Sequence, residues 1–367
     1  MTYRWLARRL RRWACCCSRF KGRRCKSVFL VPPLVVTVLV LLPTYWWFAV
    51  ESSVALLLPP MITDSLHHYW VNRNLRHYIT NVDILIEPSA SPCESSDYVP
   101  VIIMVASAPY NYIQRQTVRH TWAPYQRTFF VLGLPMDDKD DLNEFLVNTH
   151  LEAKEHSDII LYDFHDRYQN LTLKTALMMK WTLDQCPQAE FLFKTDDDVM
   201  VNPWTLRRVL WDSREAELIG YSMNNSHLHR DEHNKWYIPR WMLRPDFVPK
   251  YLSGTGYLIS GDLIEKILRK AYQVPMINLE DVYFTYLVAL KELRLHLTHD
   301  RRLNPYKPWL KIGCVYWDLA SVHSLGPKEM LSAWSKVENL VDGYNSTKSV
   351  CSVFKSYFYD FHDLLLH

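Results

Sequence analysis

Glycine is scarce in this chain, with nine residues in 367. The sequence has no G-x-G-x-x-G run and no G-x-x-x-x-G-K-[ST] loop, so nothing supports a dinucleotide-binding or P-loop protein. The chain also lacks net positive charge outside residues 1–27, which hold ten Lys or Arg and no Asp or Glu. Without that segment the formal net charge of +3 becomes −7 (3 − 10). The basic pI therefore belongs to the N-terminus and gives no support for nucleic-acid binding.

The N-terminus predicts a membrane anchor. Residues 28–50 carry no charge and are long enough to cross a bilayer, which takes about 20 apolar residues. The basic flank at 1–27 should stay cytosolic, so the chain after residue 50 should lie on the far side as a type II signal-anchor protein. A cleaved signal peptide is the alternative, but its apolar region normally spans only about 7–15 residues. Residues 51–97 predict a stem, of which residues 84–86 could pack onto the domain, and residues 98–367 predict the folded domain.

The eight cysteines divide between the two sides of the predicted membrane. Four lie in the basic tail, where S-acylated and reduced, inert thiols are equally compatible with the sequence: Cys15, Cys16, Cys17 and Cys25. Four lie on the far side, where two disulfides could form in three pairings: Cys93, Cys186, Cys314 and Cys351. N-glycosylation triplets begin at Asn170, Asn224 and Asn345, also on the far side, in agreement with this topology.

Continuous apolar runs predict strands that are covered on both faces, at 101–105, 128–132, 158–162 and 191–193. Helical patterns separate these runs, at 115–122, 142–153 and 173–183. Strands that alternate with helices predict an α/β fold with a mostly parallel central sheet and helices on both faces. Ligands of such sheets bind beyond the carboxyl ends of the strands.

Three consecutive carboxylates, Asp196, Asp197 and Asp198, directly follow the last predicted strand. Adjacent carboxylates in an apolar run repel one another and resist desolvation, and a bound cation would remove both problems. Oxygen ligands suit Mg²⁺ or Mn²⁺. On an extended chain, Asp196 and Asp198 would point to one face and Asp197 to the other. A solvated acidic turn is the alternative, but the position at the ligand-binding edge of the sheet favours a metal.

Seven motifs follow one another along residues 99–335. They are R-Q-T-V-R-H-T-W at 115–122, F-V-L-G at 130–133, the run at 155–175, K-T-D-D-D at 194–198, Y-L-S-G-T-G-Y at 251–257, E-D-V-Y at 280–283 and V-H-S-L-G-P-K-E-M at 322–330. Together they resemble the β1,3-glycosyltransferases, which include β1,3-galactosyltransferases and β1,3-N-acetylglucosaminyltransferases, with Fringe as a distant relative. Two positions depart from the family pattern, since Thr285 and Ala123 stand where the family usually has Gly.

The resemblance implies a GT-A type nucleotide-sugar-binding fold and a Golgi membrane protein with a luminal catalytic domain. It implies inverting transfer of galactose, GalNAc or GlcNAc from a UDP-sugar to an acceptor glycan on a glycolipid or glycoprotein. It also implies a Mn²⁺ or Mg²⁺ site formed by Asp198 and His323, with Asp196 at the metal or at the donor's ribose or sugar. A catalytically inactive member that acts as a luminal lectin or chaperone is the alternative.

The E-D-V-Y motif supplies the candidate catalytic pair. The resemblance makes Asp281 the general base that takes the proton of the acceptor hydroxyl, and Glu280 a residue that orients the acceptor or its neighbour. The pair is expected at the start of a helix, where carboxylates are also favoured without any catalytic role.

Further residues are predicted to bind the donor. Lys194 belongs to the K-T-D-D-D motif, and Asp197 would act through water. Gly254 and Gly256 would let the backbone approach a ligand closely, or would simply form a turn. Arg115 and Arg119 share a helix face, where Arg115 could reach the diphosphate or uracil and Arg119 could equally form a structural salt bridge.

Overall fold

The computed structural model describes residues 66–89, 93, 98–136, 139–342 and 351, together with 41–42 and 45–46. The chain divides into two compact units, 1–61 and 62–367, and the folded domain is the second. The predicted tail and anchor at 1–50 lie almost entirely outside the described residues. Among the residues that are described, no helix is both long and apolar enough to cross a bilayer.

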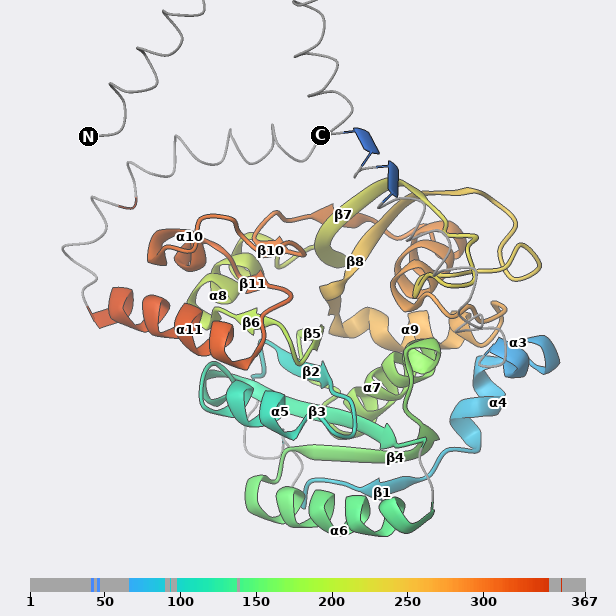
Figure 1. The fold of residues 1–367 in the computed structure, drawn as a ribbon, viewed down its shortest axis with the longest axis horizontal. Coiled ribbons are helices and arrows are strands. Elements are labelled where there is room, and N and C mark those ends of the chain that lie inside the picture. Colours follow the sequence, from blue (N-terminus) through green and yellow to red (C-terminus); the bar gives the residue numbers. More distant parts are fainter. Residues whose placement is uncertain are drawn as a thin grey trace, which may run out of the picture. The chain divides into compact units, whose positions relative to one another are not determined.

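The domain is an α/β structure built on a mixed sheet of eight strands (Figure 1). In spatial order the strands are β1 (Ile84–Ile86), β4 (Ile159–His165), β3 (Arg127–Leu134), β2 (Ile102–Ala106), β5 (Phe191–Asp196), β8 (Phe247–Ser260), β7 (Leu218–His227) and β9 (Leu297–His299). The four predicted strands, β2 to β5, form the parallel centre. Strand β8 runs antiparallel to β5 and to β7, β9 is parallel to β7, and β1 is antiparallel to β4. Because β1 belongs to the sheet, part of the predicted stem is part of the domain.

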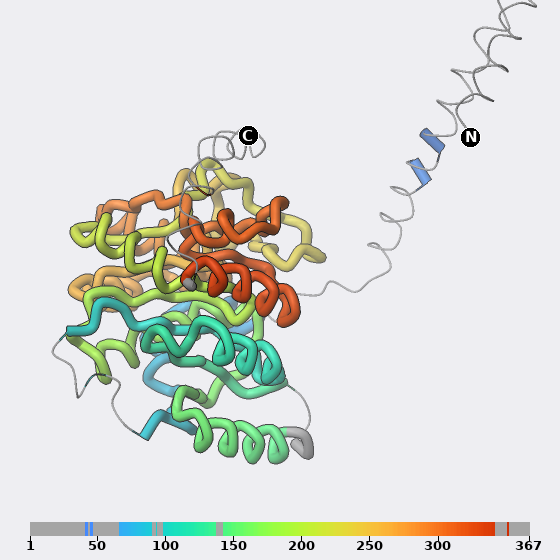
Figure 2. Tube along the Cα trace, turned by 90° about the vertical axis from the view of Figure 1, so that its left-hand side faces the viewer, coloured from blue at the N-terminus to red at the C-terminus, as the bar shows by residue number. Residues whose placement is uncertain are grey.

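Helices cover both faces of the sheet. They are α3 (His67–Val71), α4 (Leu75–Thr80), α5 (Tyr112–Arg119), α6 (Lys139–His156), α7 (Leu171–Gln185), α8 (Pro203–Asp212), α9 (Gly261–Ala271), α10 (Gly313–Asp318) and α11 (Pro327–Asp342). The described part of the domain also has short 3₁₀ turns, η3 (Ala123–Tyr125) and η4 (Tyr168–Asn170), and a π-helix, η5 (Val282–Glu292). The three predicted helices are confirmed as α5, α6 and α7. Figure 2 shows α11, in red, beside α5, in teal.

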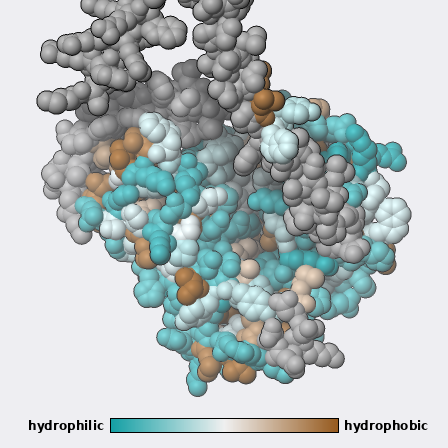
Figure 3. All heavy atoms as spheres, in the orientation of Figure 1, coloured by the Kyte–Doolittle hydropathy of each residue, from teal (hydrophilic) through white to brown (hydrophobic). Residues whose placement is uncertain are grey.

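Strand β2 shows why an uninterrupted apolar run was needed. Val101, just before the strand, and Ile103 and Val105 within it pack in a core with α5, α8 and α11. The alternate residues Ile102 and Met104 pack in a second core with α7, α9 and η5. Side chains of a strand alternate between faces, so a strand between two cores must be apolar at every position. On the face that Figure 3 shows, the coloured residues are mainly hydrophilic, with apolar residues in small separate groups.

A second, three-stranded sheet includes the strand that follows the Asp triplet. It consists of β10 (Leu303–Asn304), β11 (Ser321–Val322) and β6 (Met200–Val201), with β11 in the middle. Since β6 comes directly after the triplet and β11 directly before His323, this sheet brings the two motifs together.

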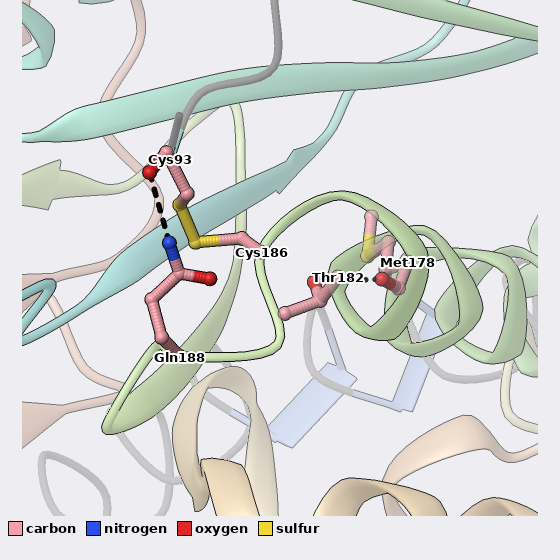
Figure 4. Close-up of a disulfide and its surroundings, with 5 residues drawn as sticks. All are labelled: Cys93, Met178, Thr182, Cys186 and Gln188. Atoms are coloured by element: carbon pink, nitrogen blue, oxygen red, sulfur yellow. Dashed lines mark hydrogen bonds between the residues drawn. A yellow bond between two sulfur atoms is a disulfide. The ribbon is translucent and has the colours of Figure 1, made fainter. Parts of the chain in front are cut away.

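The structure resolves the pairing of the four far-side cysteines. Cys93 is bonded to Cys186, at the end of α7, and Cys314 on α10 is bonded to Cys351. Figure 4 shows the first disulfide, next to which the Gln188 side chain donates a hydrogen bond to the carbonyl oxygen of Cys93 (2.9 Å). The sequence left three pairings open.

Candidate active site

The Asp triplet lies at the carboxyl end of β5, as predicted. Strand β5 ends at Asp196, and residues 197–198 form a turn before β6, closed by a hydrogen bond from Val199 N to the Asp196 carbonyl (3.3 Å). The chain is not extended across the triplet, because the strand ends at Asp196, so side-chain alternation does not decide whether Asp196 and Asp198 share one face. Each of the three carboxylates has its own partner.

Asp198 lies beside His323, which directly follows β11. The Asp198 Oδ2 and His323 Nε2 atoms are 3.4 Å apart, and both side chains are partly exposed, at 41% and 26%. His323 Nδ1 faces the carbonyl oxygen of Pro305 at 3.1 Å, and Leu325 N donates to the Asp198 carbonyl at 2.9 Å. Burial raises the pKa of Asp198, while the nearby His323 opposes that shift. Two segments more than 120 positions apart thus present one carboxylate and one imidazole to the same space.

The donor set of this pair fits a hard divalent cation. A histidine whose Nδ1 is held by a carbonyl presents Nε2 as a ligand. Within the described residues no group of three or more His, Cys, Asp or Glu is arranged to hold a metal, and the third predicted ligand, Asp196, is bonded to Lys194. Magnesium-type ions commonly bind through one or two protein ligands plus phosphate oxygens and water. The pair therefore suits a cation that arrives with a diphosphate better than an all-protein metal site.

Lys194 is a buried cation that holds several parts of the site together. Its Nζ donates to Asp196 Oδ1 and to the carbonyl oxygen of Gly254, both at 2.7 Å, and lies 3.7 Å from Glu280 Oε2. Burial alone would lower the pKa of this lysine, but the carboxylates of Asp196 and Glu280 outweigh burial and raise it. Lys194 thus stays charged, is buried, and fixes Asp196 in place.

Glu280 and Asp281 open the helical segment that continues as η5, as predicted. Asp281 Oδ1 accepts a hydrogen bond from Val282 N (2.8 Å) and Oδ2 accepts one from Gly254 N (3.1 Å). Glu280 is buried, and its Oε1 accepts a hydrogen bond from the Tyr257 hydroxyl. Burial raises the pKa of Glu280 to about 7, although Lys194 opposes this shift. Burial also raises the pKa of Asp281, against the two backbone hydrogen bonds. Asp281 is the member of the pair that remains partly exposed.

The two glycines of the predicted ligand-binding turn lie in an irregular part of β8. A Cβ atom added to Gly254 would lie 3.1 Å from Asp281 Oδ2, and one added to Gly256 would lie 3.0 Å from the ring of Phe193. Both contacts are tighter than ordinary van der Waals contacts. The close approach at Gly254 therefore serves the candidate base, while a ligand contact at either glycine stays a prediction.

Asp197 points into the domain. It is buried, and its Oδ2 accepts hydrogen bonds from the Ser107 hydroxyl (2.7 Å) and from Asn111 Nδ2 (2.9 Å). Burial raises the pKa of Asp197, and those two hydrogen bonds oppose the shift. Its side chain thus ties the turn to the β2–α5 loop, which argues against direct contact with a donor.

Arg115 and Arg119 form a buried ion-pair network with α6 and β4. Arg115 binds both oxygens of Glu152 at 2.7–2.8 Å, and Arg119 binds Glu152 and, with two nitrogens, Asp158. Because both guanidinium groups are already paired with carboxylates, Arg119 forms a structural salt bridge, and neither arginine is a free cation. Arg115 and Glu152 also line a pocket of about 660 Å³, together with Tyr110, Tyr112 and Phe145. Contact of Arg115 with a ligand in that pocket stays a prediction.

Several residues around the site were not singled out from the sequence. Lys174 on α7 is buried and bonds Asp166 Oδ2 (2.6 Å) and the carbonyl oxygen of Ser107 (2.7 Å). Asp166 also accepts a hydrogen bond from Gly133 N (3.0 Å), so the pair joins the ends of β2, β3 and β4. Desolvation raises the pKa of Tyr168 and the charges of Asp281 and Asp196 raise it further, although 38% of the residue is exposed. Asp166, Tyr168 and Lys174 all stood within the motif at 155–175, but nothing in their spacing gave their partners.

The predicted glycan acceptors differ in accessibility. Asn170 is buried and its Nδ2 donates to the carbonyl oxygen of His165 (2.8 Å), while Thr172 of the same triplet is also buried. The folded domain therefore argues against a glycan on Asn170, because the nitrogen that would carry it is already used. Asn224 is exposed on β7, and Asn345 lies outside the described residues.

The chain is similar in sequence to known glycosyltransferases. The family profile described as galactosyltransferase matches residues 113–301, just over half of the 367 residues. Mouse beta-1,3-galactosyltransferase 5 is 31% identical over 65% of this chain and 79% of its own length. Human beta-1,3-galactosyltransferase 1 is 31% identical over 65% of this chain and 74% of its own. Among solved structures, a glycosyltransferase involved in the glycosylation of the major capsid of PBCV-1 matches with a TM-score of 0.33 and 11% identity, over 65% of this chain and 99% of that one.

The family profile and the curated relatives define the class of the protein, which is a glycosyltransferase. Within this class the chain belongs to the galactosyltransferase family and is similar to its β1,3-galactosyltransferases.

Proposed function

We propose that this chain is an inverting, metal-dependent β1,3-glycosyltransferase of the GT-A type. It would transfer galactose, GalNAc or GlcNAc from a UDP-sugar to a hydroxyl of an acceptor glycan on a glycolipid or glycoprotein. One observation carries the proposal: Lys194 joins the two halves of the site. Its Nζ bonds Asp196 in the triplet and the carbonyl of Gly254, whose N–H in turn donates to Asp281. The names of the relatives make galactose the first donor to test.

Asp281 is the base in this proposal, because its carboxylate is partly exposed whereas Glu280 is buried and bonded to Tyr257. In a single displacement the acceptor oxygen bonds to the anomeric carbon while the bond from that carbon to the diphosphate oxygen breaks. The electron pair of the broken bond leaves with UDP, and the hydroxyl proton passes to Asp281. A pKa raised by burial makes this carboxylate a stronger base than an exposed one.

Asp198 and His323 would hold the cation. Bound Mn²⁺ or Mg²⁺ would neutralise charge on the departing diphosphate. Asp196 would face the donor's ribose or sugar, since its side chain is 31% exposed and its carboxylate is held by the buried Lys194. Asp197 supports the turn through Ser107 and Asn111 rather than by contact with the donor.

The N-terminal sequence supports a location for this activity. The uncharged run at 28–50 behind a basic tail is typical of a type II signal-anchor, and the two disulfides fit an oxidising lumen. We therefore propose a Golgi membrane protein with its catalytic domain in the lumen.

The test is a donor panel with the purified full-length chain in detergent. UDP-galactose, UDP-GalNAc and UDP-GlcNAc are each incubated with a panel of acceptor glycans, with Mn²⁺ or with EDTA, and both UDP and glycan product are measured. We expect one donor to give product with Mn²⁺ and none to do so with EDTA. Transfer that is unchanged in EDTA would contradict the metal assignment.

The alternative function gives a different result in the same assay. A catalytically inactive lectin or chaperone would release no UDP with any donor, and would still bind glycans on an array. That outcome would overturn the proposed enzyme.

A further inference from the structure

The pairing of strand β8 with strand β7 is interrupted at the segment of β8 that lies against Asp281. Gly220 on β7 pairs with Tyr257 and Ser222 pairs with Leu252, so residues 253–256 of β8 face a single residue of β7. Such a bulge bends the strand and releases backbone groups from the ladder. Leu252 is the last residue of β8 that is paired before this bulge, and its N–H donates to the hydroxyl of Thr285 on η5, at 2.9 Å.

The same hydroxyl makes a second bond. Thr285 is fully buried, and its Oγ1 donates to the carbonyl oxygen of Asp281 at 2.6 Å. A threonine hydroxyl has one hydrogen to donate and lone pairs to accept, so this one is used in both directions. It thereby joins the bulged strand to the first turn of the segment that carries the candidate base.

A second link between the same two elements lies beside it. Gly254, two residues after Leu252, donates its N–H to Asp281 Oδ2 at 3.1 Å. The length of that bond depends on the spacing between β8 and the start of η5, and Thr285 fixes this spacing from the buried side.

We propose that Thr285 is a positioning residue for Asp281: its hydroxyl holds the bulge of β8 against the start of η5, so that the Gly254 N–H stays on the carboxylate. This inference rests on the proposed function, in which Asp281 is the base.

Loss of the hydroxyl has a predictable effect on the carboxylate. The Leu252 N–H would remain buried without a partner, which favours a small separation of β8 from η5. A weaker Gly254 bond would raise the pKa of Asp281, because that bond favours the charged form. The other groups that face Asp281 are Lys194, Glu280, Tyr168, Tyr251 and Tyr257, and the substitution changes none of them.

The experiment compares T285V and T285A, which lack the hydroxyl, with T285S, which keeps it. T182V is the matched control, since Thr182 is also buried in a helix and donates to the carbonyl four residues earlier, at Met178 (2.9 Å; Figure 4). We expect kcat of T285V to fall about tenfold, the equivalent of one to two hydrogen bonds, with the donor KM unchanged. The acid limb of its pH profile should move to higher pH. T285S should restore both values, and T182V should change neither.

A readout without turnover separates this inference from the proposed function. The pKa of Asp281 is followed by NMR of ¹³C-labelled aspartate in the wild type and the variants. A higher pKa in T285V and T285A, restored in T285S, supports the positioning role even if no donor is transferred. An unchanged pKa and kcat in T285V, or an equal change in T182V, would overturn it. Absence of transfer by the wild type would instead overturn the proposed function alone.

Discussion

Replacing Asp281 by Asn separates catalysis from stability at the candidate base. The carboxylate accepts two backbone hydrogen bonds, from Val282 N at 2.8 Å and Gly254 N at 3.1 Å. An Asn side chain can keep one of them through its single oxygen, so D281N loses about one hydrogen bond, or about 1 kcal/mol of the free energy of unfolding. Lys194 keeps Asp196 and Glu280 as partners. The variant should therefore fold.

Transfer should fall far more than stability. A general base contributes about 10²- to 10⁴-fold to a rate, which corresponds to about 3–5.5 kcal/mol of activation free energy. This loss exceeds the expected destabilisation severalfold. The matched control is D262N, since Asp262 is likewise in the first turn of a helix, α9, but is exposed and accepts a side-chain hydrogen bond from Ser260.

The assay measures kcat/KM for glycan product and, by calorimetry, binding of UDP with Mn²⁺. We expect D281N to lose transfer and keep UDP binding, and D262N to behave as wild type. Transfer by D281N within tenfold of wild type would refute the assignment of the base. Loss of UDP binding would instead place Asp281 in the donor site.

Three further predictions test the surroundings of the base and the metal. In G254A the new Cβ would lie 3.1 Å from Asp281 Oδ2, whereas in G256A it would meet the ring of Phe193. We therefore expect kcat to fall further in G254A than in G256A. Equal losses in the two variants would argue against a role of Gly254 in holding Asp281. D198A and H323A should each raise the Mn²⁺ concentration for half-maximal transfer about tenfold or more, and an unchanged Mn²⁺ titration would remove that residue from the metal site. The pKa of Glu280 is raised by burial from 4.5 to about 7, so the folded state binds the proton more tightly and the free energy of unfolding should decline as pH rises from about 4.5 through about 7. Urea denaturation across this range should show a smaller decline in E280Q, and an identical pH dependence would contradict the assignment.

The elements that the sequence predicted were those with a local cause. Strand β2 is apolar at every position because both of its faces are covered, and this was visible in the run from Val101 to Val105. The helix start at Glu280 and the triplet at the end of β5 were also predictable, because each follows from neighbouring residues in the sequence.

Features that depend on partners far along the chain were not predictable. The chain turns after Asp196 because β6 must pair with β11, more than 100 residues later. The buried pair of Lys174 and Asp166 and the pairing of Cys93 with Cys186 likewise depend on the tertiary fold. The π-helix η5 has no pattern of its own, since its residues are mostly buried on all sides.

The most direct test of the central claim is the stereochemistry of the product. The full-length chain, its best donor from the panel and a defined acceptor are followed by NMR as transfer proceeds. We predict that a β-linked sugar forms at the 3-hydroxyl of the acceptor from the α-linked donor, with one UDP released for each linkage made. An α-linked product, or UDP released without a glycosidic linkage, would contradict a single displacement with Asp281 as the base.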